Sequence, residues 1–174
     1  KVEFTDNLKL DFERRDFTIN AMAYNDNRGL VDEFGGIKDL KDGIIRCVGD
    51  AGQRFDEDAL RMLRAVRFAG QLGFAIEEKT REAIVERADH LKNISAERIR
   101  VELTKLLVSK EAGRIRDAYK TGMTKYFLPE LDAAMQTEQK NPHHIYTVGE
   151  HSICGIELMN CFFGITSDEK IYDK

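Results

Sequence analysis

From Asp56 onward, apolar residues recur at the three- and four-residue spacing of α-helices, and this pattern constrains the fold more than any other feature. Only two of the 174 residues are proline, so few positions interrupt the pattern. Ser95 is expected to cap a helix, although Arg98 stands where a capping box needs Glu or Gln. Loops are expected at Gly122 and at 128–130. Helices are expected at 56–73, which Gly73 would end, and at 77–88, 95–108, 112–119 and 144–163.

The first 55 residues mix helical and strand patterns. The segment from Leu10 to Tyr24 is predicted to be a helix, followed by a turn at 25–29. Short β-branched runs predict strands at 30–31 and 43–48, with the Gly35-Gly36 pair between them. The sequence therefore predicts a mostly α fold with a small α+β portion in front.

Composition excludes several classes of protein. A formal charge of −4, from 27 basic and 31 acidic residues, excludes a uniformly basic nucleic-acid binder. No apolar run approaches 18 residues and the N-terminus lacks a secretory signal, so no membrane segment is expected. Three cysteines are too few for a disulfide scaffold. These features predict a cytoplasmic protein.

Four charged residues recur at every third position: Asp58, Arg61, Arg64 and Arg67. On one continuous helix they would form a slowly drifting stripe beside an apolar stripe. Aligned guanidinium groups repel one another unless an anion lies between them, and their planar forks suit phosphate. The alternative is a solvated face on which neighbouring acids pair with the arginines.

A second polar cluster lies at residues 14–21, where Arg15 and Asp16 stand beside a threonine and an asparagine. Alone, such a cluster is typical of a surface helix. Together, the two clusters indicate a groove of basic groups with a few specific carboxylates, which suits a nucleotide or polyphosphate.

The two clusters carry a resemblance to a known family. Residues 14–21, Arg-Arg-Asp-Phe-Thr-Ile-Asn-Ala, resemble the second motif of the class II nucleotidyltransferases, the CCA-adding enzymes and bacterial poly(A) polymerases. Residues 32–40 are similar to the family's glycine-containing hinge, 57–68 to its Glu-Asp-x-x-Arg motif, and 96–99 to its fifth, structural motif. The resemblance covers residues 2–130. It implies the end of a head domain (1–55), a base-recognising neck (56–110) and the start of a helical body (111–174).

The resemblance implies a mechanism in which protein side chains replace a nucleic-acid template. Asp58 and Arg61 would read the base of CTP or ATP, and Arg64 and Arg67 would hold the triphosphate. Arg15 and Asp16 would hold phosphate and ribose, while the 3′ end of tRNA would be the acceptor. The family's Mg²⁺ is held by an Asp-x-Asp pair that has no match here and is expected upstream of Lys1. These 174 residues alone are therefore expected to be inactive.

Other functions fit some of the same residues. A poly(A) polymerase uses the same motif spacing, although the acidic balance favours a CCA-adding enzyme, and CC-adding or A-adding relatives fit as well. A non-catalytic RNA-binding helical module would also lack the carboxylate pair. A structural helical domain with surface arginines would have no affinity for nucleotides.

Three of the four histidines cluster near the C-terminus, where His151 precedes Cys154 by three residues. The segment resembles the entry to an HD-type metal phosphohydrolase fold, which makes His151 a candidate metal ligand. The spacing of Cys154 and Cys161 fits no zinc pattern and favours cysteines packed inside a helix.

Overall fold

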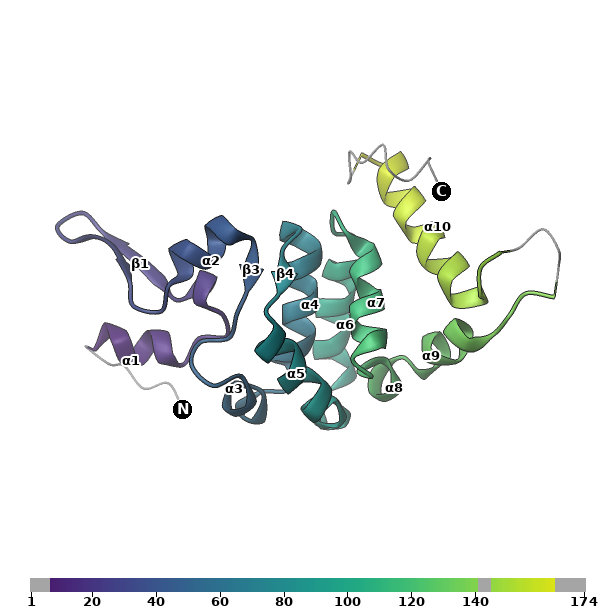
Figure 1. Cartoon of the computed structure of the whole chain (residues 1–174), viewed down its shortest axis with the longest axis horizontal. Helices are drawn as coiled ribbons and strands as arrows, with labels where there is room; N and C mark the ends of the chain where they lie inside the picture. The colour runs from purple at the N-terminus through teal and green to yellow at the C-terminus, as the bar shows by residue number, and fades with distance from the viewer. Residues whose placement is uncertain (1–6, 141–144, 165–174) are drawn as a thin grey trace.

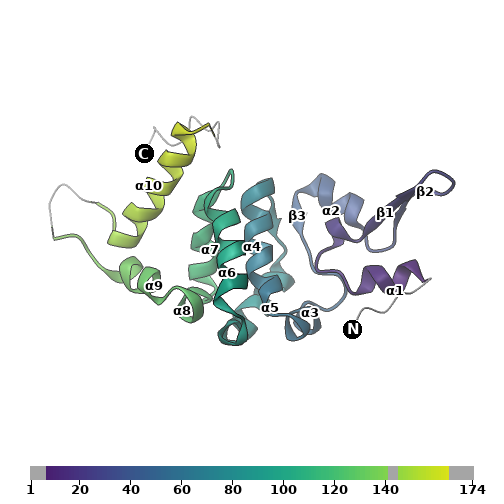
Figure 2. The same cartoon turned by 180° about the vertical axis from the view of Figure 1, so that it is seen from behind.

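The computed structural model describes residues 7–140 and 145–164, which form an elongated, mostly helical molecule (Figure 1). Small helices and a hairpin lie at the N-terminal end, and a group of upright helices fills the middle. A long helix near the C-terminus lies at the opposite end, and Figure 2 shows the same order from behind. The predicted combination of a small α+β portion and a helical remainder is confirmed.

The N-terminal portion contains short elements. They are α1 (Leu8–Glu13), the 3-10 helix η1 (Thr18–Asn20), β1 (Met22–Asn25), β2 (Gly29–Asp32), α2 (Gly36–Asp42) and β3 (Ile44–Ile45). Strands β1 and β2 pair antiparallel in register, with Met22 opposite Asp32 and Asn25 opposite Gly29. The predicted turn at 25–29 closes this hairpin, and Gly29 adopts a left-handed φ of 70°.

The predicted helix from Leu10 to Tyr24 is wrong beyond Glu13. The side chain of Asp16 accepts two hydrogen bonds, from the backbone N–H of Phe17 at 2.9 Å and from the side-chain amide of Asn20 at 3.1 Å. Short polar side chains that bond locally in this way compete with helix formation. The chain turns here and continues as β1.

The remaining elements are almost all helical. They are α3 (Ala51–Glu57), α4 (Leu60–Leu72), β4 (Ala75–Ile76), α5 (Glu78–Arg87), η2 (Ala88–Asn93), α6 (Ala96–Leu107), η3 (Ala112–Arg114), α7 (Ile115–Lys120), α8 (Thr124–Phe127), α9 (Pro129–Gln136) and α10 (Val148–Phe162). The helices predicted at 77–88, 95–108 and 112–119 correspond to α5, α6, and η3 with α7. None of the helices in the described residues is long and apolar enough to cross a bilayer.

The predicted continuous helix at 56–73 is interrupted at Asp58. This residue has an extended backbone, with φ −154° and ψ 101°, and separates α3 from α4. Its Oδ1 accepts a hydrogen bond at 3.2 Å from the N–H of Leu60, the first residue of α4, whose N-cap position is Ala59. Gly73, with φ 70°, ends α4 as predicted.

Four further predictions need correction. The strand expected at 43–48 is limited to Ile44–Ile45, which pairs parallel with Ala75–Ile76. Ser95 occupies the N-cap position of α6, but in the part of the chain that the structure describes its side chain makes no capping hydrogen bond to that helix. The loop expected at 128–130 is instead the start of α9, because Pro129 suits the first turn of a helix. The helix expected from His144 begins at Val148, and His144 lies outside the described residues.

Helix α4 lies at the centre of the main hydrophobic core. Its Met62, Leu63, Ala65, Val66 and Ala69 side chains are fully buried, and the helix packs against α6. A further fully buried residue, Phe17, joins this core and contacts Phe68 edge to face at 5.8 Å. Burying a large apolar side chain stabilises a fold by about 1.5–3 kcal/mol. Phe17 therefore fixes the segment around Asp16 against α4.

Candidate functional site

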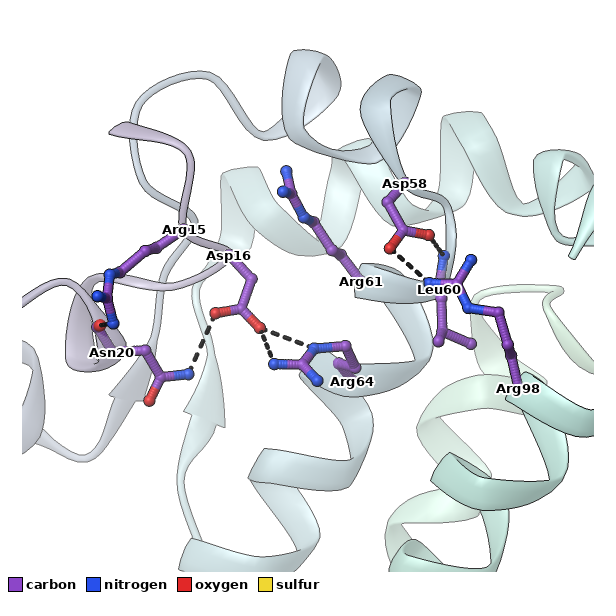
Figure 3. A pocket seen from close by; sticks show the side chains of 8 residues that line it. All are labelled: Arg15, Asp16, Asn20, Asp58, Leu60, Arg61, Arg64 and Arg98. Atoms are coloured by element: carbon purple, nitrogen blue, oxygen red, sulfur yellow. Dashed lines mark hydrogen bonds and ion pairs between the residues drawn. The ribbon is translucent and has the colours of Figure 1, made fainter. Parts of the chain in front are cut away.

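A cavity of about 500 Å³ lies where three separate segments of the chain meet (Figure 3). The segment after α1 contributes Arg15, Asp16 and Asn20. The start of α4 and the break before it contribute Asp58, Leu60, Arg61 and Arg64, and the first turn of α6 contributes Arg98. Five of the residues that the sequence singled out thus line one cavity.

Asp58 projects into this cavity from the break between α3 and α4. Its Oδ1 is held by the Leu60 N–H, and its Oδ2 accepts a hydrogen bond from Nη2 of Arg98 at 2.7 Å. The Asp58 side chain is 30% exposed, so solvent and ligands reach it. The carboxylate is therefore oriented by two donors and still accessible.

The guanidinium of Arg61 is held by groups other than Asp58. Its Nη1 donates to Oε2 of Glu57 at 2.7 Å and to the carbonyl oxygen of Arg54 at 3.1 Å. Its Nη2 donates to the carbonyl oxygen of Arg14 at 2.9 Å. Arg61 therefore bridges α3 and the segment after α1, and Figure 3 shows it between Asp16 and Asp58. The two proposed base readers face one cavity and are not paired with each other.

Arg64 and Asp16, which both line the cavity, form an ion pair. Nε and Nη2 of Arg64 lie 2.8 and 2.5 Å from Oδ2 of Asp16, a carboxylate that is almost buried. The same guanidinium stacks over the ring of Phe68, 5.5 Å from its centroid. One third of the Arg64 side chain remains exposed toward the cavity. This pair links the N-terminal portion to α4 through a charge-assisted hydrogen bond.

Arg15 forms the outer edge of the cavity. It donates to Oδ2 of Asp11 at 2.9 Å and to the carbonyl oxygen of Asn20 at 3.0 Å, and it is nearly half exposed. With Arg61, Arg64 and Arg98, it gives the cavity four guanidinium groups against two carboxylates. This excess of positive charge suits an anionic ligand.

Arg67 does not line the cavity. Its Nε lies 2.5 Å from Oε2 of Glu102, and its Nη1 donates to Gln71. The guanidinium also lies 3.7 Å from the centroid of the Phe68 ring, and both Arg67 and Glu102 are buried. The position of Arg67 does not support the expected contact with a triphosphate. Arg61, Arg64 and Arg67 all lie on α4, where each step of three residues stops about 60° short of a full turn, and this drift turns Arg67 toward α6.

His151 lies on α10, which forms the C-terminal end of the described molecule and is apart from the central helices α4 and α6 that line the cavity (Figure 1). Within residues 7–140 and 145–164, no three His, Cys, Asp or Glu side chains gather as metal ligands would. Cys154 contacts Arg116, whose guanidinium also binds Glu150 and Glu157. These contacts join α7 to α10 and pack the two helices together.

Asn20, Leu60 and Arg98 are cavity residues that sequence reasoning did not assign. Asn20 lies inside the polar cluster at 14–21, so its neighbours could have indicated it. The sequence showed one unusual feature of Arg98, which stands where a capping box needs Glu or Gln. That feature does not indicate a binding site. The approach of Arg98 to Asp58 spans 40 residues and depends on the packing of α6 against α4.

Comparisons with known proteins show which family the chain resembles. Residues 1–46 match the family profile described as "Poly A polymerase head domain", and residues 73–135 match "Probable RNA and SrmB- binding site of polymerase A". A CCA-adding enzyme of Lactobacillus delbrueckii subsp. bulgaricus is 50% identical over 126 residues, which are 72% of this chain and 32% of the relative. One of Bacillus licheniformis is 50% identical over 132 residues, covering 75% and 33%.

Solved structures give the same result. The CCA-adding enzyme of Bacillus stearothermophilus in complex with CTP superposes with a TM-score of 0.72 at 42% identity, over 75% of this chain and 34% of that one. A CCA-adding enzyme in complex with ATP superposes with a TM-score of 0.62 at 37% identity, over 74% and 34%. The chain spans about a third of the length of these relatives. It belongs to the class II nucleotidyltransferase family of CCA-adding enzymes and bacterial poly(A) polymerases.

Proposed function

We propose that the chain is the nucleotide-selecting part of a CCA-adding tRNA nucleotidyltransferase, which adds CMP and AMP to the 3′ end of tRNA. The observation that carries the proposal is the convergence of Arg15, Asp16, Asp58, Arg61 and Arg64 on one cavity. Relatives named as CCA-adding enzymes, two of them solved with CTP or ATP, support the same reaction.

Base selection follows from the chemistry of Asp58 and Arg61. Cytosine and adenine both present an amino donor beside a ring-nitrogen acceptor. A carboxylate accepts from the first group, and a guanidinium donates to the second. Uracil and guanine present the opposite order, and each mispaired buried group costs about 1–3 kcal/mol. One pair of side chains can thus accept CTP and ATP and reject UTP and GTP.

The remaining cavity residues suit the phosphates and the ribose. Arg64 and Arg15 present guanidinium groups at the cavity, and their planar forks match phosphate oxygens. Asp16 and Asn20 offer polar groups for ribose hydroxyls. Because Arg64 already pairs with Asp16, an incoming triphosphate would have to share or replace that ion pair.

We assign residues 1–55 to the end of a head domain, 56–110 to a base-recognising neck and 111–174 to the start of a helical body. The tRNA acceptor and a cytoplasmic location follow from the reaction. The described residues do not form a site for the family's Mg²⁺, since no cluster of metal ligands occurs among them. No catalytic step is therefore assigned to these residues, and His151 remains a candidate ligand on sequence grounds alone.

The experiment is calorimetric titration of CTP into the chain and into Arg61→Ala, with Arg81→Ala as a control for lost charge on the exposed face of α5. We expect CTP to bind the wild type and Arg81→Ala equally and Arg61→Ala at least about tenfold more weakly. Since Arg61 also binds two backbone carbonyl groups, Asp58→Asn serves as a second variant of nearly unchanged shape. Equal CTP affinity in all four proteins would contradict the proposed site. No CTP binding by the wild type would favour the structural helical domain.

A further inference from the structure

The two oxygens of the Asp58 carboxylate are held by different elements. Oδ1 accepts from the Leu60 N–H at the start of α4, and Oδ2 accepts from Nη2 of Arg98 in the first turn of α6. The first contact is local, whereas the second brings in a helix that begins 38 residues later in the sequence. With both contacts present, the plane of the carboxylate is fixed.

Asp58 and Arg98 also lie at the boundary between two cavities. The second cavity, of about 460 Å³, lies beside the first and is lined by both residues. His90 and Asn93 of η2 also line this second cavity. The Asp58 side chain therefore has open space on two sides, and the contact with Arg98 determines which way it faces.

We propose that Arg98 is a positioning residue that orients the Asp58 carboxylate toward the base of the incoming nucleotide. This inference rests on the proposed function, because it assumes that Asp58 reads the base. Each carboxylate oxygen can accept two hydrogen bonds, so the donors from Leu60 and Arg98 leave acceptor capacity on both oxygens. Arg98 can thus stay in place while a base amino group binds. Without Arg98, the carboxylate is free to rotate toward the second cavity.

The experiment compares the affinities for CTP and UTP, measured by calorimetry, because a change in their ratio reports base reading and not general stability. We expect Arg98→Ala to lower the CTP-to-UTP affinity ratio about tenfold. Arg98→Lys keeps the positive charge and one donor nitrogen and should restore part of the ratio, since Arg98 uses one nitrogen for this contact. The control is Arg100→Ala, an exposed arginine of the same helix that lines neither cavity.

A double-mutant cycle separates positioning from a merely structural role. In an Asp58→Asn background, Arg98→Ala should have no further effect on the CTP-to-UTP ratio, because the group that it orients has already been changed. An unchanged ratio in Arg98→Ala, with a lowered ratio in Asp58→Asn, would overturn the inference and leave the proposed function intact. Tighter CTP binding by Arg98→Ala would also overturn it, since Arg98 would then compete with the base. No discrimination by the wild type would overturn both.

Discussion

Each arginine of α4 has a different environment, although the three are evenly spaced in sequence. Arg61 lines the cavity and donates to the backbone carbonyl groups of Arg54 and Arg14, and Arg64 lines it and pairs with Asp16. Arg67 is buried against α6, where it pairs with Glu102. The identity of these residues indicates a preference for anions, but their partners decide which of them remain available to a nucleotide.

Replacing Arg67 tests this distinction. We expect Arg67→Ala to lower the free energy of unfolding by about 3 kcal/mol, because the buried Glu102 would lose its close partner and keep only the guanidinium of Arg64, 3.9 Å away. Urea denaturation measures the loss, and the paired variant Arg67→Met with Glu102→Met should recover most of it. The CTP-to-UTP affinity ratio should not change. A stable Arg67→Ala protein with weakened CTP binding would instead support the triphosphate contact expected from the sequence.

At the scale of elements, aspartates at helix starts decide where short helices begin. Asp58 ends α3 and accepts a hydrogen bond from the first N–H of α4, and Asp32 binds the first N–H groups of α2, although the N-cap residues of these helices are Ala59 and Gly35. The Asp32 carboxylate accepts hydrogen bonds from the Gly36 and Ile37 N–H groups at 2.8 and 2.9 Å. Burial raises the pKa of Asp32, but these backbone donors outweigh it and hold the pKa below its usual value.

The lowered pKa of Asp32 predicts a dependence of stability on pH. A carboxyl group with a lower pKa in the folded state stabilises the fold above its unfolded pKa of about 3.9. This contribution is lost as the pH falls through the folded pKa. Asp32→Ala should therefore cost about 1 kcal/mol at pH 7 and progressively less below pH 4. Urea denaturation at pH 7 and pH 3 measures both values, and an equal cost at the two pH values would show that the carboxylate charge plays no part.

The sequence predicted most helices of the second half because their apolar spacing is regular and their ends carry glycine or polar residues. The division at Asp58 could not be predicted, since aspartate occurs both inside helices and at their ends. No glycine or proline marks the break between Glu57 and Leu60. The two-residue parallel pairing of β3 with β4 joins segments about thirty residues apart, and no local pattern encodes it.

At the scale of the whole molecule, the candidate site and α10 lie at different places along one elongated body (Figure 1). The site draws on three segments, and the sequence indicated two of them because each carries a dense polar cluster. Arg98 could not be predicted, since its role depends on how α6 packs against α4. Helix α10 is held separately, by the Asn160 amide, which donates to the carbonyl oxygens of Leu107 and Ser109, and by Arg116 of α7. Arg116 binds Glu150 at 2.8 Å and Glu157 at 3.0 Å.

Removing Arg116 should therefore loosen α10 without affecting nucleotide selection. We expect Arg116→Ala to increase amide hydrogen exchange over residues 148–162, because two partly buried carboxylates lose their shared partner. Arg114→Ala is the matched control, since Arg114 pairs only with Glu111 and Asp117 among the described residues, both within three positions. Unchanged exchange in α10, or a changed CTP affinity, would contradict this separation.

Titration of the wild-type chain with CTP, ATP, UTP and GTP tests the central claim most directly, because it asks whether Asp58 and Arg61 read a base without a template. We predict that CTP and ATP bind with similar affinity, each at least about tenfold more tightly than UTP and GTP. Equal affinity for all four nucleotides, or a preference for ATP and GTP over CTP and UTP, would contradict the claim.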